Sequence, residues 1–128
     1  MPNPGEILTV DLESTRLFGW EKRKSDKVID ALIKAIERGA DIPPVRVYAE
    51  RDDLFLAASI HPSNEGSLSP DGGHHRAIAH YIAGAPLPVK ILQGENCVRY
   101  TPIPINDIEI VDDNGELAAK QRRDPNYR

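Results

Sequence analysis

The chain has 128 residues, of which 40% are hydrophobic and 28% are charged, a composition typical of soluble globular proteins. This length accommodates one domain with its own hydrophobic core, so we expect a single domain over residues 1–128. No apolar run approaches the roughly 18 residues that cross a bilayer. The N-terminus lacks the basic and apolar regions of a signal peptide, and we expect a cytoplasmic protein without membrane partners. A single cysteine, Cys97, excludes an internal disulfide framework.

The formal net charge is −4, from 16 Lys and Arg against 20 Asp and Glu. This balance argues against a broad electrostatic surface for duplex nucleic acid. Two local basic runs remain, at Lys22–Lys24 and Lys120–Arg123. Short runs of this kind are more often solvated surface than a nucleic-acid site. Nucleic acid is therefore an alternative partner and not the favoured one.

The first predicted strand covers residues 7–12, where hydrophobic and polar side chains alternate. Residues 13–24 are charged and irregular, and no element is predicted there. A helix is predicted to follow Ser25, a favourable N-cap residue, and to end at Gly39. Hydrophobic side chains recur at helical spacing between them, at Val28, Ile29, Leu32, Ile33 and Ile36.

A β-hairpin is predicted next. Two consecutive prolines force an extended entry into its first strand at residues 45–50, and a polar turn at residues 51–53 leads to its second strand at residues 54–60. Residues 61–70 are rich in Ser, Pro, Asn and Gly, which predicts a loop.

A second helix is predicted over residues 73–84, between two glycines, and a strand over residues 87–92. Two prolines exclude a central strand over residues 101–105, whereas residues 107–111 fit an edge strand. We expect a flexible tail over residues 114–128. This order of elements predicts a small α+β domain with a mixed sheet, a β-hairpin and two main helices.

The start of the second helix carries an unusual set of residues: Asp71, Gly72, Gly73, His74, His75 and Arg76. A helix N-terminus is positive, so cations there are disfavoured by about 0.3–1 kcal/mol each. A bound anion would reverse this penalty, because a glycine pair allows close approach to the backbone N–H groups, and Arg and His donate hydrogen bonds to phosphate. The alternative is a plain turn with His74 and His75 exposed to solvent. No metal site is predicted, because His80 is not four residues from either histidine.

The chain resembles the ParB/sulfiredoxin superfamily in Ile42–Val47, in Asp71–Ala79, in Gly84 and in Leu87–Ile91. The resemblance covers about residues 7–92 and implies a small ParB/sulfiredoxin-like domain, of the kind also called ParB-like nuclease-type. The loop is most similar to that of the free serine kinase branch, which carries Asp-Gly-His-His-Arg and transfers phosphate from ADP to serine.

That branch places a glutamate shortly before the first helix as the base for the substrate hydroxyl. Glu21 stands at about the matching position and would take this role; the alternative is an ordinary polar lead-in to the helix.

Other branches of the superfamily match this chain less well. His74 occupies the position of the sulfiredoxin cysteine, which argues against sulfinic acid reduction. In the CTP-binding loop of partitioning ParB proteins, arginines stand where this chain has His75 and Ile78. We also expect no counterpart of the DNA-binding domain that follows in those proteins.

Two functional hypotheses follow. In the first, the protein is a phosphotransferase or nucleotide hydrolase: Gly72, Gly73, His74, His75 and Arg76 hold the phosphates of ADP, ATP or CTP, with Mg²⁺ as a companion ion. Glu21, Asp71, His74 and His75 are then the catalytic candidates, with His75 stabilising charge and the others handling protons or Mg²⁺. In the second, the protein is a non-catalytic module of a plasmid, phage or DNA-modification system that binds nucleic acid or another partner. Paired carboxylates that would indicate a nuclease are not found.

Overall fold

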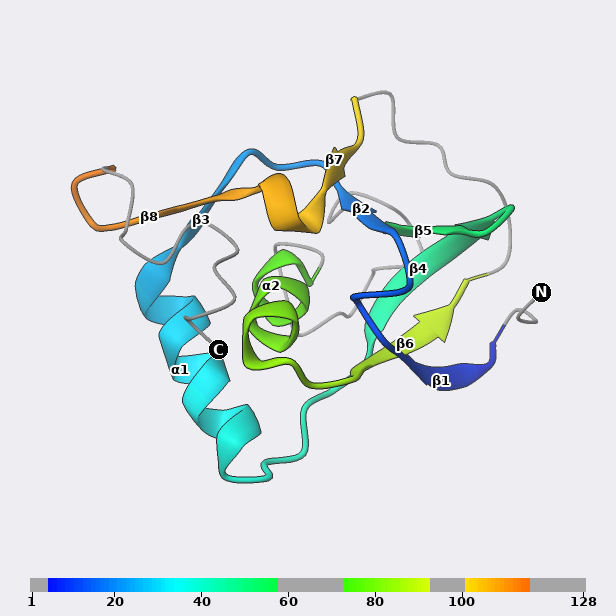
Figure 1. Cartoon of the computed structure of the whole chain (residues 1–128), viewed down its shortest axis with the longest axis horizontal. Coiled ribbons are helices and arrows are strands. Elements are labelled where there is room, and N and C mark those ends of the chain that lie inside the picture. The colour runs from blue at the N-terminus through cyan, green and yellow to red at the C-terminus, as the bar shows by residue number, and fades with distance from the viewer. Residues whose placement is uncertain (1–4, 58–72, 93–100, 116–128) are drawn as a thin grey trace.

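The computed structural model describes residues 5–57, 73–92 and 101–115 (Figure 1). In these parts of the chain, two α-helices, eight short strands and one turn of 3-10 helix form an α+β fold, as the sequence predicts. The predicted loop at residues 61–70, the end of the predicted second hairpin strand and residues 116–128 of the predicted tail lie outside the described residues. None of the helices in the described parts is long and apolar enough to cross a membrane.

Six strands form one mixed sheet in the order β1-β6-β4-β5-β2-β7. Their bounds are β1 Ile7–Val10, β2 Leu17–Gly19, β4 Val45–Glu50, β5 Asp53–Leu56, β6 Leu87–Ile91 and β7 Ile103–Pro104. Strands β4 and β5 are the predicted hairpin, and the pairs β4–β6 and β2–β5 are parallel. Strand β7 lies at the sheet edge, where Pro104, which has no backbone N–H to donate, is tolerated.

A second, two-stranded parallel sheet joins β3, Arg23–Ser25, to β8, Glu109–Val111. The 3-10 helix η2, Ile105–Asp107, leads from β7 toward β8. The expectation that residues 13–24 form no element was therefore wrong, since β2 and part of β3 fall inside them. Both strands pair with segments distant in sequence, β5 and β8, and such pairing leaves no periodic signal in three residues.

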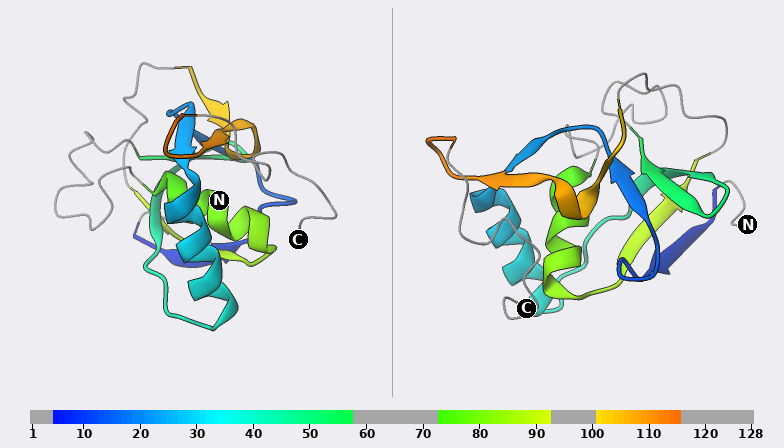
Figure 2. Two further views of the ribbon diagram at one scale, coloured as in Figure 1. Left: turned by 90° about the vertical axis from the view of Figure 1, so that its left-hand side faces the viewer. Right: turned by 45° about the horizontal axis from the view of Figure 1, so that its top comes forward.

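The two predicted helices are both present. Helix α1, Asp26–Glu37, begins after Ser25 and is followed by Gly39, whose φ of +78° is left-handed. Helix α2, His74–Ala83, ends at Gly84, also left-handed with a φ of +70°. Figures 1 and 2 show α2 lying between α1 and the large sheet.

The hydrophobic core fills the space around α2. The helix contributes Ala77, Ile78 and Ile82, and the facing sheet contributes Val45, Val47, Leu54, Leu56, Leu87, Val89 and Ile91. Three buried isoleucines close the core on the opposite side, at positions 105, 108 and 110. The core therefore extends past residue 92, where the segment that carries the family resemblance ends.

Candidate functional site

The residue before α2, at the N-cap position, is Gly73, which has a φ of +94° and supplies no capping side chain. A side-chain carbon at this position would also lie 2.7 Å from Cγ1 of Val45, so both conformation and packing select glycine. The first intrahelical bond runs from Ala77 N–H to the Gly73 carbonyl at 3.0 Å. Residues 74–76 thus form the first turn of the helix, the end at which the helix dipole favours an anion.

His74 is buried, with 1% of its surface exposed. Its Nε2 accepts a hydrogen bond from the backbone N–H of Trp20 at 2.9 Å, which places the ring proton on Nδ1. The ring fits because Gly19 has no side chain: a Cβ there would lie 2.7 Å from Nε2 and from Cδ2 of His74. The alternative reading of an exposed histidine in a plain turn is thus wrong for His74.

Glu21 reaches the start of α2 from the connection between β2 and β3. Its Oε2 lies 3.7 Å from Nδ1 of His74, and its Oε1 accepts a hydrogen bond from Nζ of Lys24. Lys24 is 9% exposed and Glu21 is 41% exposed, so the carboxylate remains accessible while both its partners are buried. We call Glu21, Lys24 and His74 the Glu21 cluster. The structure therefore brings together two of the predicted site residues, Glu21 and His74.

Lys24 is the member of this cluster that the sequence reading missed, because it assigned the basic run at residues 22–24 to solvated surface. That assignment was wrong for Lys24. The side chains of a strand alternate between its two faces, and within β3 Arg23 is exposed while Lys24 is buried. A strand prediction over residues 23–25 would have revealed this alternation, but three residues are too few to support one.

His75 links the starts of the two helices. Its Nε2 accepts a hydrogen bond from the backbone N–H of Ser25 at 3.3 Å, and Ser25 is the residue that precedes α1. The hydroxyl of Ser25 makes no capping bond, although its position is the predicted one. Both helices thus begin beside each other, and both positive helix ends lie at the side of the molecule where β3 enters α1 (Figure 1).

Arg76 points to a different neighbour. Its Nη1 donates to the carbonyl oxygens of Pro43 and Pro44, at 2.9 and 3.0 Å. Residues two positions apart on a helix are separated by about 200° around its axis. Arg76 therefore leaves α2 on roughly the opposite face from His74. The guanidinium therefore ties α2 to the entry of β4, and the structure does not place it in the Glu21 cluster.

Two of the predicted site residues, Asp71 and Gly72, lie outside the described residues. His80 is a structural residue: Nδ1 lies 2.6 Å from the Arg76 carbonyl, and burial lowers the pKa of the imidazole. Within residues 5–57, 73–92 and 101–115, no three His, Cys, Asp or Glu side chains gather in a way that could hold a metal ion.

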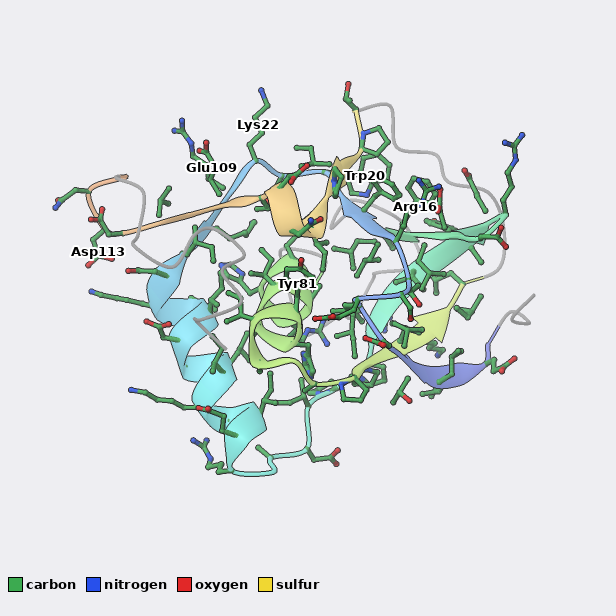
Figure 3. The ribbon with its side chains drawn as sticks, in the orientation of Figure 1. Arg16, Trp20, Lys22, Tyr81, Glu109 and Asp113 are labelled. Carbon is green, nitrogen blue, oxygen red and sulfur yellow. The ribbon has the colours of Figure 1, made fainter. Side chains whose placement is uncertain are left out.

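In the first basic run, Arg23 and Lys24 each pair with an acidic neighbour. Nε of Arg23 lies 3.2 Å from Oε2 of Glu109, and beyond the run Lys27, in the first turn of α1, bonds to Asp113. Figure 3 shows Lys22, Glu109 and Asp113 together on the side formed by β3 and β8. These pairs reduce the positive field that a nucleic-acid backbone would meet. The second basic run, at residues 120–123, is outside the described residues.

Comparison with known proteins finds no matching family model, no matching curated protein and no matching solved structure. The relation to the ParB/sulfiredoxin superfamily therefore stays a prediction from the residues named above.

Proposed function

We propose that the N-terminus of α2 binds the phosphate groups of a nucleotide such as ADP, ATP or CTP. The observation that carries this proposal is the Glu21 cluster, a carboxylate with a buried lysine and a buried histidine, beside a glycine-capped helix start. The N–H groups of residues 74–76 would donate to phosphate oxygens, and two helix ends would add positive potential. This location agrees with the one that the family resemblance implies.

Lys24 supplies the positive side chain in this proposal. A buried ammonium group is costly unless an anion is close, and Glu21 is that anion in the present structure. A phosphate that enters would share Lys24 with Glu21. Arg76 contributes through the position it gives to α2, because its Nη1 is engaged by two backbone carbonyls.

The same site supports phosphoryl transfer as its reaction. Glu21 would accept the proton of an acceptor hydroxyl, the hydroxyl oxygen would form a bond to the terminal phosphorus, and the bond from that phosphorus to the leaving phosphate oxygen would break. His74 would act as a positioning residue, since its Nδ1 faces Glu21 while its Nε2 is held by Trp20. Mg²⁺ would accompany the nucleotide and spread the charge of the phosphates.

Isothermal titration of the full chain with ADP, ATP and CTP, each with and without Mg²⁺, tests the binding step. We expect binding to one of them, weakened about tenfold or more in Lys24→Gln, because a charge-assisted hydrogen bond to phosphate is lost. Lys34→Gln, an exposed lysine near the end of α1, is the matched control and should bind normally. Absence of binding by the wild-type protein at millimolar nucleotide would disprove the proposal.

Glu21→Gln separates binding from chemistry. This variant should retain nucleotide binding and lose transfer of phosphate to a hydroxyl acceptor, followed by ³¹P NMR with serine as the first acceptor. Nucleotide binding without turnover in the wild-type protein, across several hydroxyl acceptors, would instead support a non-catalytic module in which the nucleotide acts as a switch.

A further inference from the structure

Trp20 follows the last residue of β2 and joins it to two other parts of the molecule (Figure 3). Its backbone N–H donates to Nε2 of His74 at 2.9 Å, and its indole Nε1–H donates to the carbonyl oxygen of Leu56. Trp20 is 8% exposed, and its indole stacks with the ring of Phe55, with ring centres 6.0 Å apart and 22° between the ring planes. Trp20 is therefore fixed both at its backbone and at its side chain.

The consecutive residues Trp20 and Glu21 face the two nitrogens of one imidazole ring. The Trp20 N–H is bonded to Nε2 of His74, while Oε2 of Glu21 lies 3.7 Å from Nδ1. The tautomer of a neutral imidazole is set by the hydrogen bonds that its nitrogens make. An N–H donor at Nε2 keeps the ring proton on Nδ1, the nitrogen nearer to the carboxylate. The position of Trp20 therefore determines both where this proton lies and where the chain continues into Glu21.

The bond between the indole and Leu56 links this arrangement to the large sheet. Leu56 is the last residue of β5, a strand that pairs with β4 on one side and with β2 on the other. His74 is the first residue of α2. Trp20 thus connects the end of β5 to the start of α2 through two hydrogen bonds. A displacement of the indole would also displace the backbone N–H that holds the His74 ring.

We infer that Trp20 is a positioning residue for the proposed transfer reaction, because its indole bond to β5 keeps His74 in the Nδ1–H tautomer beside Glu21. The inference rests on the proposed function, in which Glu21 accepts the proton of the acceptor hydroxyl. In that function the phosphates are held by the first turn of α2 and by Lys24, and not by Trp20. Replacement of Trp20 should therefore slow transfer more than it weakens nucleotide binding.

Long-range ¹H–¹⁵N NMR of the full chain without nucleotide, at about pH 8, where an ordinary histidine is neutral, tests the positioning itself. We expect His74 of the wild-type protein to show a protonated Nδ1 and an unprotonated Nε2. In Trp20→Phe, which keeps an aromatic ring and removes the indole donor, the Nε2–H tautomer should appear as well. Phe55→Leu is the matched control, because it removes the ring that stacks with the indole and leaves the indole bond to Leu56. His74 should keep the wild-type tautomer in this control.

The rate of transfer is the second measurement. Followed by ³¹P NMR, Trp20→Phe should transfer phosphate about tenfold more slowly than wild type, because catalysis is sensitive to small displacements of the reacting groups. Isothermal titration should give both proteins the same nucleotide affinity. Trp20→Tyr, which also lacks the indole donor, takes the place of Trp20→Phe if that variant does not fold.

The inference is overturned if wild-type His74 carries its proton on Nε2, if Trp20→Phe leaves the tautomer unchanged, or if Phe55→Leu changes it to the same extent. It is also overturned if Trp20→Phe weakens nucleotide binding as much as it slows transfer. A wild-type protein that binds no nucleotide disproves the proposed function instead. The NMR measurement, which uses no nucleotide, still decides in that case whether Trp20 positions His74.

Discussion

Replacing Gly19 with alanine tests the packing that holds His74 beside Glu21. The φ of Gly19 is not positive, so alanine suits the backbone and the effect comes from contact alone. The new Cβ would lie 2.7 Å from Nε2 and Cδ2 of His74 and 3.2 Å from Cδ1 of Ile108. The ring is 1% exposed and closely packed, so relieving this contact displaces Nε2 from the Trp20 N–H whose hydrogen bond it accepts.

The expected cost has two parts. Overpacking a core costs about 1–3 kcal/mol, and a buried N–H that loses its acceptor costs about 1–3 kcal/mol. Because one displacement of the ring can relieve the first while causing the second, the two parts overlap, and we expect the free energy of unfolding to fall by about 2–4 kcal/mol. Urea unfolding followed by the fluorescence of Trp20, the single tryptophan of the chain, measures this change.

A double-mutant cycle identifies the cause. In a His74→Ala background the ring atoms are gone, and Gly19→Ala should then cost less than about 1 kcal/mol, the remainder coming from Ile108. A coupling of at least about 1 kcal/mol between the two substitutions is therefore expected. Equal costs in the two backgrounds would show that His74 does not occupy the space beside Gly19.

Three further predictions concern the same helix. Gly73→Ala should lower the free energy of unfolding by about 2–4 kcal/mol in urea, because its φ of +94° is strained for alanine and the new Cβ would meet Val45 at 2.7 Å. Gly39→Ala is the control, since Gly39 has a similar φ of +78° but nothing lies within 4 Å of the new Cβ. A smaller effect in Gly73→Ala than in Gly39→Ala would contradict the prediction. Arg76→Met should cost about 1–2 kcal/mol in the same assay, since the carbonyls of Pro43 and Pro44 lose a charged donor. Burial lowers the pKa of His80 in the folded state, so at a pH below about 6.5 the unfolded chain binds more protons than the folded chain. The free energy of unfolding should therefore fall as the pH drops from about 6.5. Urea midpoints at pH 7.5 and 5.5 measure this fall, and His80→Gln should reduce it.

Local sequence signals predicted the elements that carry their own periodicity. Five hydrophobic residues at helical spacing identified α1, and the glycines at positions 39 and 84 marked the ends of the two helices. The hairpin followed from two hydrophobic runs around a polar turn. In each case the residues that specify the element lie within or next to it.

Strands β2 and β3 could not be predicted in this way. Each has three residues, and each exists because a distant segment supplies its hydrogen-bond partners. The same reason explains what the sequence missed in the candidate site. Lys24 is buried only because β3 pairs with β8, and Glu21 meets His74 only because the β2–β3 connection passes the start of α2.

The basic start of α2 is the sequence feature that indicates an anion, and the structure changes which groups support that argument. His74 and His75 each accept a backbone N–H bond at Nε2, and Arg76 is directed at two carbonyls, so these three side chains are engaged by the protein itself. The attraction for phosphate would instead come from the backbone N–H groups and from Lys24, whose charge Glu21 now matches.

Phosphate binding and activation of Glu21 are therefore coupled in the proposed mechanism. A phosphate that shares Lys24 releases one oxygen of the Glu21 carboxylate from its hydrogen bond, and that oxygen becomes available to accept the proton of a hydroxyl. Lys24→Gln should thus impair both nucleotide affinity and the rate of transfer, whereas Glu21→Gln should raise affinity slightly, because the phosphate no longer competes with a carboxylate for Lys24. Titration of the two variants side by side with wild type measures this difference, and a lower affinity in Glu21→Gln than in wild type would refute the coupling.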